Sequence, residues 1–343
     1  MSLTIQQGDI AGWEQLPHDE KVARMRSILN KVRTLYDANI PLFTKDNIRK
    51  VGEELKLCQK DALDCNRNVT LKGINGVDYT TWAVLPPSLK RKKKLQHIRG
   101  PTWAIYYASI ERLLKEGDVK FFDPKTAYLP MQIMSCYVDM RHEDENELHV
   151  TSAEGLCEAF YDIERKWKMS QAYEQLQTTL DAVKAAVKTG FVLDKVVGVA
   201  LGHLILITQV NRRSIIQHAL ITAIHSILLP TSSKRFVQDP IYIQQEKDVL
   251  CSAGFTVLED PQAFLTLDNS SILVSIRPNV PVKQIVADTC RPGIIIWQRK
   301  CDIVTTDPDS PRVDRMLEQE YHMMDFPCQE FLGDLVMYIR KAT

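Results

Sequence analysis

The second half of the chain contains a small group of residues whose types could support acid–base chemistry. Asp239 and Glu246 could together bind a guanidinium or ammonium group, or could act as an acid and a base. Tyr242 would place a hydroxyl group between these carboxylates, and His203 could serve as a general base. We therefore treat Asp239, Tyr242, Glu246 and His203 as the candidate catalytic residues.

The same residues have structural interpretations that the sequence leaves open. Asp239 could cap the helix that follows it, with Pro240 at the first helical position. Glu246 could lie on a solvated helix face, and His203 could be a hydrogen-bonded histidine of the core. The sequence does not choose between these roles and the catalytic ones.

Two glycines, Gly198 and Gly202, lie where a strand is expected to end, and glycine lets a backbone come close to a ligand. Gln217 and Asn279 lie in segments near the same sheet edge, so these four residues are the candidate substrate-binding residues. The glycines could instead only permit tight packing of a helix on the strand. They do not form a Gly-x-Gly-x-x-Gly fingerprint, and no Gly-Lys-Ser/Thr phosphate loop occurs. We therefore expect no cofactor and disfavour a nicotinamide or ATP enzyme.

The elements that must position these residues alternate between apolar strands and helices over about residues 188–299. The expected strands cover 196–201, 235–237, 255–258, 271–276 and 293–297, and the expected helices cover 214–229, 242–253 and 282–289. This pattern is typical of a parallel sheet with helices on both faces and right-handed crossovers. The fold class is therefore α/β, with a Rossmann-like sheet. Since ligands of such sheets bind beyond the carboxyl ends of the strands, the turn at 239–246 should share a crevice with the end of the 196–201 strand.

The chain divides into residues 1–150, a mixed and mainly helical extension, and 151–343, the Rossmann-like domain with its C-terminal tail. Apolar residues at helical spacing predict a helix over 22–36, and Thr44 is expected to cap a second helix. Residues 102–115 are expected to form a third helix. A chain of 343 residues is long enough for two such domains.

A run of cations is the strongest local charge feature of the first region. It comprises Lys90, Arg91, Lys92, Lys93 and Lys94, with Arg99 nearby. Consecutive cations can hold a phosphate backbone, and nearby aromatic residues could stack on unpaired bases. The alternatives are a solvated helix face and a nuclear localisation tract. The formal net charge of the whole chain is zero, so no global field selects nucleic acid or membrane.

The cysteines and the N-terminal residues indicate the compartment. Eight cysteines are scattered along the chain without a Cys-x-x-Cys pair, which argues against a structural zinc site and favours a reducing environment. The first residues lack the basic start and apolar stretch of a signal peptide, and the most apolar run, 196–210, is too short to cross a bilayer. We expect a cytoplasmic protein, with the nucleus as the alternative, and no metal.

Residues 196–297 resemble the domain of the sensitivity-to-red-light-reduced family. The resemblance is carried by the glycine-bearing strand Val197–Gly202, by Gln217-His218-Ala219-Leu220, by Asp239-Pro240 with Glu246 and Leu250, and by Gly254–Leu258. Residues 279–288 and 306–313 further resemble the filamentous-fungal branch of this family. That branch includes the arginine-containing cyclodipeptide synthases, which join two aminoacyl groups from charged tRNAs into a diketopiperazine.

This resemblance implies an aminoacyltransferase whose partners are arginyl-tRNA and a second charged tRNA, with neither DNA nor a membrane expected. The basic run would hold tRNA, and Asp239 and Glu246 would bind the guanidinium or ammonium group. Tyr242 would position the amine or relay a proton, and the loop from Gly198 to His203 would supply backbone donors to an oxyanion. The wider family also suggests a non-enzymatic regulator linked to light signalling, clock output or haem metabolism. A Rossmann-type transferase or oxidoreductase with a small cofactor is the remaining alternative.

Overall fold

The computed structural model describes residues 12–60, 67–83, 98–139, 152–187, 192–206, 209–300, 305–327 and 331–342. The chain forms two compact units. One comprises Met1–Lys94 with Pro101–Cys136, and the other comprises Leu95–Gly100 with Tyr137–Thr343. Each unit is described by itself.

The first unit begins with the helices that the apolar spacing predicts. Its helices are α1 (His18–Asp37), α2 (Lys45–Lys60) and α4 (Ile110–Leu113), and its short 3-10 turns are η2 (Trp13–Gln15), η3 (Val119–Phe121) and η4 (Thr126–Tyr128). The Thr44 cap is confirmed, because its Oγ1 accepts a hydrogen bond from the backbone nitrogen of Asn47 at 3.1 Å. Strands β1 (Arg67–Lys72) and β2 (Asp78–Ala83) form an antiparallel hairpin.

The helix predicted over 102–115 is wrong for most of its length. Strand β3 (Ile98–Tyr107) occupies this stretch and forms a two-stranded sheet with β4 (Met131–Asp139). Trp103, Ile105 and Tyr107 are buried while the residues between them are only half-buried, a period of two that belongs to a strand. The unit therefore combines helices with two strand pairs.

The second unit is built on a seven-stranded sheet with the order β12-β13-β11-β10-β5-β8-β9. Its strands are β5 (Lys195–Val199), β8 (Lys234–Gln238), β9 (Thr256–Val257), β10 (Ser271–Ser275), β11 (Ile294–Gln298), β12 (Tyr321–Asp325) and β13 (Leu335–Arg340). Strands β11, β10, β5, β8 and β9 are parallel to their neighbours in this series. Strand β13 runs antiparallel to both β11 and β12. The predicted Rossmann-like sheet is confirmed, with an antiparallel strand added beside β11.

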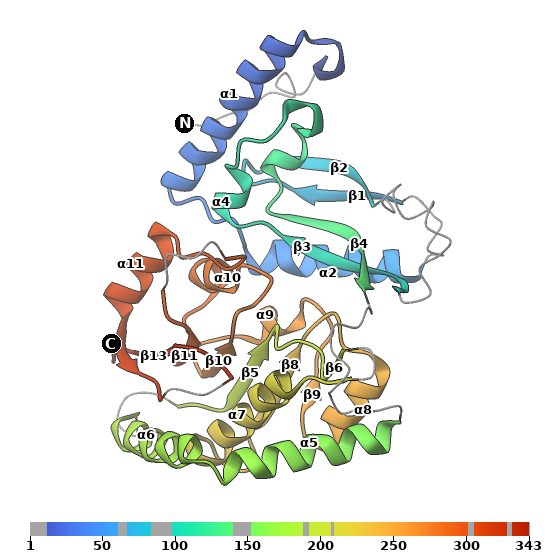
Figure 1. Cartoon of the computed structure of the whole chain (residues 1–343). Coiled ribbons are helices and arrows are strands. Elements are labelled where there is room, and N and C mark those ends of the chain that lie inside the picture. Colours follow the sequence, from blue (N-terminus) through green and yellow to red (C-terminus); the bar gives the residue numbers. More distant parts are fainter. Residues whose placement is uncertain are drawn as a thin grey trace. The chain divides into compact units, whose positions relative to one another are not determined.

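Helices cover this sheet in layers. They are α5 (Ala153–Lys168), α6 (Gln171–Val187), α7 (Arg212–Leu228), α8 (Gln244–Ser252), α9 (Gln262–Thr266), α10 (Val282–Thr289) and α11 (Pro311–Glu320). Helix α7 packs on β5 and β8, and α5 and α6 lie outside α7 (Figure 1). Because α7 is covered on both sides, apolar residues surround it instead of forming one stripe. A short hairpin of β6 (Ile205–Leu206) and β7 (Gln209–Val210) precedes α7.

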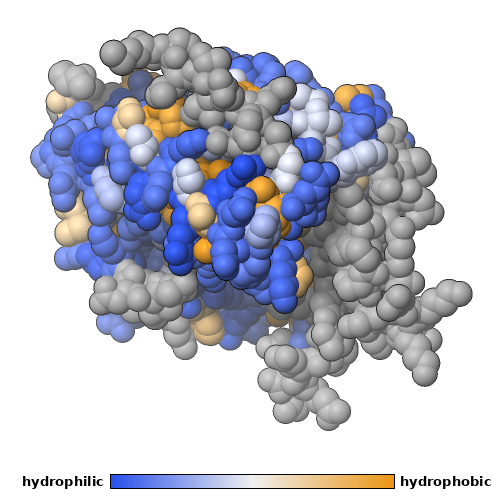
Figure 2. Space-filling model, turned by 90° about the horizontal axis from the view of Figure 1, so that it is seen from above, coloured by the Kyte–Doolittle hydropathy of each residue, from blue (hydrophilic) through white to orange (hydrophobic). Residues whose placement is uncertain are grey.

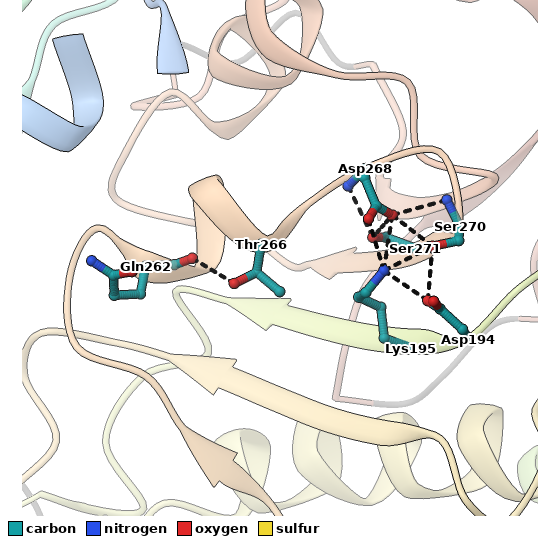
Figure 3. A network of polar contacts seen from close by, with 7 residues as sticks. All are labelled: Asp194, Lys195, Gln262, Thr266, Asp268, Ser270 and Ser271. Atoms are coloured by element: carbon teal, nitrogen blue, oxygen red, sulfur yellow. Dashed lines mark hydrogen bonds and ion pairs between the residues drawn. The ribbon is translucent and has the colours of Figure 1, made fainter. Parts of the chain in front are cut away.

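A polar cluster fixes the amino ends of β5 and β10, opposite the edge where ligands of such sheets bind. Lys195 Nζ lies 2.7 Å from Asp194 Oδ1 and 2.9 Å from Asp268 Oδ2, and Ser270 and Ser271 complete the cluster (Figure 3). Burial alone would raise the pKa of Asp268, but hydrogen bonds from Lys195 and the two serines lower it to about 2. Each carboxylate of this cluster pairs with the one ammonium group, and the hydrogen bonds join the starts of the two strands, which indicates a structural role.

The segment before α11 docks on α10 through buried charges. Lys283, which is almost fully buried, lies 2.8 Å from Asp309, and its backbone nitrogen donates to Asp307 at 2.9 Å. These contacts join the two segments, 279–288 and 306–313, that carry the finer resemblance in the sequence. The ammonium group also lies over the Trp297 ring, 5.7 Å from its centroid.

On the face shown in Figure 2, the described surface is mostly hydrophilic, and its apolar residues form small separate patches. The large apolar side chains that are exposed in the described residues come from scattered positions, among them Trp82, Phe121, Met169 and Val192. No described helix combines the length and the apolar character needed to cross a membrane.

Candidate active site

Asp239 joins the loop after β8 to the loop after β5. Its side chain is buried; Oδ2 accepts a hydrogen bond from the backbone nitrogen of Gly202 at 2.8 Å, and Oδ1 accepts from Ile241 at 3.2 Å. Burial raises the pKa of Asp239, and the two backbone hydrogen bonds oppose this. Asp239 is not a helix cap, because α8 begins at Gln244 with Ile243 at the cap position. The predicted capping role is therefore wrong.

Glu246 is completely buried beneath the same loop, so the solvated helix position considered for it is wrong. Its Oε1 accepts from the backbone nitrogen of Ile205 at 3.0 Å, and its Oε2 accepts from Ile243 at 2.8 Å. Both carboxylate oxygens also face His203 Nδ1, at 3.3 and 3.1 Å. Donors on three sides compensate the buried charge that would otherwise be costly.

His203 is held with one ring nitrogen occupied and the other free. The side chain is only 6% exposed, and Nδ1 donates to Glu246. Nε2 is buried and has no hydrogen-bond partner in the part of the chain that the structure describes. A carboxylate that orients Nδ1 leaves Nε2 as a proton acceptor, as in the base–orienter pairs of acyl-transfer enzymes. Sequence position alone could not reveal this pairing, because 43 residues separate the two side chains.

The glycine-bearing strand and the buried Asp239 and Glu246 lie within the segment whose sequence resembles a known domain. Residues 176–327 match the SRR1 domain. SRR1 abbreviates the sensitivity-to-red-light-reduced name, so the resemblance is confirmed at the level of the domain. No curated protein matches the chain.

Solved structures resemble the SRR1 domain only distantly. Phosphoethanolamine N-methyltransferase 1 of Haemonchus contortus is 11% identical, with a TM-score of 0.27 over 56% of this chain and 50% of that chain. A Thermoplasma acidophilum protein is 10% identical, with a TM-score of 0.28 over 53% and 97% of the two chains. Magnesium protoporphyrin IX methyltransferase of Synechocystis PCC 6803 is 9% identical, with a TM-score of 0.29 over 57% and 100%. The chain thus spans half the length of the first of these proteins.

Tyr242 of the SRR1 domain pairs with a histidine that the sequence-based assignment did not select. Its buried hydroxyl lies 2.8 Å from His218 Nε2, and His218 Nδ1 lies 2.7 Å from the carbonyl oxygen of Ser214. The carbonyl can only accept, so Nδ1 carries the proton and Tyr242 donates to Nε2. Burial lowers the pKa of His218 to about 4 and raises that of Tyr242 well above its usual value. Ser214 and His218 are four residues apart on one helix, and this spacing was the sequence signal for the contact of His218 with the Ser214 carbonyl.

The candidate substrate-binding residues fall into different environments. A Cβ at Gly198 would lie 2.4 Å from Ile221 Cδ1 on α7, so this glycine permits tight packing, as the structural alternative predicts. Gly202 has a φ of 79°, and a Cβ added there would meet no atom within 4 Å, so this glycine serves the loop conformation and not close packing. Gln217 is buried on α7 with Oε1 unpartnered among the described residues, and Asn279 is exposed after β10.

The predicted tRNA-binding run cannot be placed with the other site residues. Lys90, Arg91, Lys92, Lys93 and Lys94 lie outside the described residues, as does the acidic stretch 141–147. Arg99 belongs to β3, and its side chain is not described. The structure thus brings together Asp239, Glu246 and His203 at the end of β5. Tyr242, also selected from the sequence, is instead hydrogen-bonded to His218.

Proposed function

We propose that this chain is an enzyme that makes an arginine-containing cyclic dipeptide from two aminoacyl-tRNAs. The α-amine of one aminoacyl group attacks the ester carbonyl of the other, the tRNA hydroxyl leaves, and a second such attack closes the ring. Each α-amine arrives as an ammonium group and must lose a proton before it attacks, so the site needs a base. The observation that carries the proposal is the buried His203, oriented by Glu246 at 3.1 Å and with its Nε2 unpartnered among the described residues.

The observed contacts favour roles that differ from those of the sequence-based assignment. Glu246 would orient the His203 ring and stabilise its protonated form, instead of binding the substrate guanidinium itself. Asp239 would hold the loop through Gly202. The backbone N–H groups of Leu201 and His203 meet no acceptor in the described chain, so they could donate to the oxyanion of the attacked ester.

The substrate class is supported by different observations. The basic run at 90–94 suits the phosphate backbone of tRNA. The 279–288 and 306–313 segments resemble the fungal branch that includes the arginine-containing cyclodipeptide synthases, which supports arginine as one amino acid. An ester already activated on tRNA would also explain why the sequence carries no ATP loop.

The test is to express the full chain in a bacterium that supplies its own charged tRNAs, and to search for cyclic arginine dipeptides by mass spectrometry. Isotope-labelled arginine in the medium identifies arginine in the product. We expect His203→Ala to lower product by about 100-fold or more, because general bases contribute that much. His322→Ala, at an exposed position of β12, is the matched control and should leave product unchanged. Folded, soluble wild-type protein that yields no cyclic dipeptide would refute the proposal.

A non-enzymatic regulatory SRR1 protein is the second candidate. The observation that favours it is that the carboxylate oxygens of Asp239 and Glu246 accept hydrogen bonds from backbone nitrogens of this chain, as those of purely structural residues would. This candidate expects no product from any variant. It also expects that His203→Ala, once shown to fold, retains the binding of any cellular partner recovered with the wild type.

A further inference from the structure

Two arginines at the carboxyl edge of the sheet lack acidic partners among the residues that the structure describes. Arg213 lies in the first turn of α7, and Arg277 follows β10. Within the described residues neither guanidinium forms a hydrogen bond or ion pair, and the Nε of Arg213 is buried with no partner. A buried guanidinium nitrogen without an acceptor is costly, so such a group calls for an explanation.

Two other arginines of this unit form the ion pairs with carboxylates that Arg213 and Arg277 do not form in the described residues. Arg291 pairs with Glu320 at 2.8 Å, and Arg299 pairs with Asp325 and Asp334. Arg213 instead senses another cation: burial is the larger cause that lowers its pKa, and the positive charge of Arg277, an exposed residue, lowers it further. Two guanidinium groups that repel each other would both gain from an anion placed between them.

The loop 331–333 packs against Arg277 and against Arg212, the residue before Arg213. The Arg212 guanidinium lies over the Phe331 ring, 4.7 Å from its centroid. A Cβ at Gly333 would lie 2.8 Å from Nη2 of Arg277, so this guanidinium rests against glycine backbone. Arg277 has a φ of 49°, an uncommon conformation for a residue with a side chain, and such strain concentrates at ligand sites.

The place of the pair in the topology also indicates a ligand. Strands β5 and β10 are neighbours, yet the chain leaves β5 toward β8 on one side and leaves β10 toward β11 on the other. This is the switch point where ligands of open parallel sheets bind. The start of the 17-residue helix α7, capped by Asn211, adds a positive dipole end at Arg213.

We infer that Arg213 and Arg277 bind a phosphate group at this switch point. A phosphate offers more oxygens and more charge than a carboxylate, and so can accept from two guanidinium forks that come from different elements. The site would therefore take a phosphate-bearing ligand, either a mononucleotide or the backbone of a polynucleotide. The inference stands whether or not the chain makes a cyclic dipeptide.

The test is isothermal titration of the full chain with pyrophosphate, adenosine 5′-monophosphate and deacylated tRNA, with adenosine as the phosphate-free control. We expect at least one phosphate-bearing probe to bind and adenosine to bind much more weakly. Arg213→Gln and Arg277→Gln should each weaken that binding roughly tenfold to a hundredfold, the loss typical of a charged hydrogen bond. Arg165→Gln, at an exposed position of α5, should leave binding unchanged.

The pattern among probes identifies the source of the phosphate. Binding of the monophosphate that both variants weaken supports a nucleotide ligand, and tRNA binding that both variants weaken supports a polynucleotide. The inference is overturned if no phosphate probe binds the folded wild type, or if the variants and Arg165→Gln bind alike. Arg277→Gln gives a second readout: without ligand its melting temperature should equal or exceed that of the wild type, because the repulsion is relieved.

Discussion

The carboxylate of Asp239 accepts the backbone N–H of Gly202 at 2.8 Å and thereby closes the loop after β5 onto the loop after β8. The two loops follow adjacent parallel strands, so their ends meet at one edge of the sheet. Glu246 repeats this connection through Ile205 and adds His203. The geometry of the candidate base thus depends on two carboxylates that accept hydrogen bonds from the backbone after β5.

Replacing Asp239 should destabilise the fold through that connection. Asp239→Ala leaves the half-buried backbone N–H groups of Gly202 and Ile241 without their acceptor, and we expect a loss of about 2 kcal/mol in the free energy of unfolding. Urea unfolding measures it. Asp248→Ala, at an exposed position of α8, serves as the control, and an equal effect of both changes would contradict the structural role of Asp239.

A methyl group at Gly198 should conflict most with Ile221 on α7 and also with Leu201, whose Cδ1 would lie 2.7 Å away. Gly198→Ala is expected to cost about 1 to 3 kcal/mol, because its Cβ would lie 2.4 Å from Ile221 Cδ1. Ile221→Val removes that atom, so the double variant should be more stable than the sum of the single losses predicts. A double-mutant cycle with urea unfolding measures this coupling, and strict additivity would argue against the contact.

The buried His218 should make stability depend on pH. Its pKa is about 4 in the folded chain against 6.5 when unperturbed, so the unfolded chain binds the proton more readily. The contribution is complete above about pH 6.5 and is lost as the pH falls to about 4, a change on the order of 3 kcal/mol. Unfolding of His218→Gln across this range should show a flatter slope than the wild type. His322→Gln should keep the wild-type slope; equal slopes for His218→Gln and the wild type would contradict the assignment.

The ion pair between Lys283 and Asp309 should matter most when only one partner is removed. Asp309→Ala leaves a buried ammonium group uncompensated, and we expect a loss of about 3 kcal/mol. The double variant Lys283→Met with Asp309→Ala removes both charges and should recover much of that stability. Thermal unfolding compares the wild type, Asp309→Ala and the double variant. A double variant less stable than Asp309→Ala would show that the unpaired charge does not cause the loss of stability.

The core of the SRR1 domain could be predicted from its sequence because fully buried parallel strands are continuous apolar runs. The Ile294–Gln298 and Ser271–Ser275 strands were located to within a residue or two. Strand β3 was missed because its aromatic residues also fit a helix when only one face is considered. Apolar residues at every second position, such as Trp103 and Ile105, were the signal that distinguishes a strand from a helix here.

The candidate site was predictable in position but not in contacts. The sheet rule correctly brought the 239–246 turn to the end of β5. It could not show that Glu246 would use both oxygens on Ile205 and Ile243, since backbone donors leave no trace in the sequence. The relation of Arg213 to Arg277 was missed for a related reason: each arginine looks ordinary until the fold brings both to one sheet edge with no acidic partner in the described residues.

Strand β13 lies between β11 and β12 although it follows both along the chain. During synthesis, β11 therefore emerges from the ribosome with one edge open, and only the later arrival of Leu335–Arg340 covers it. In that interval the apolar Ile294–Gln298 strand offers unpaired backbone groups to any other nascent chain. Slow translation just before this point would lengthen the period in which the polypeptide depends on chaperones.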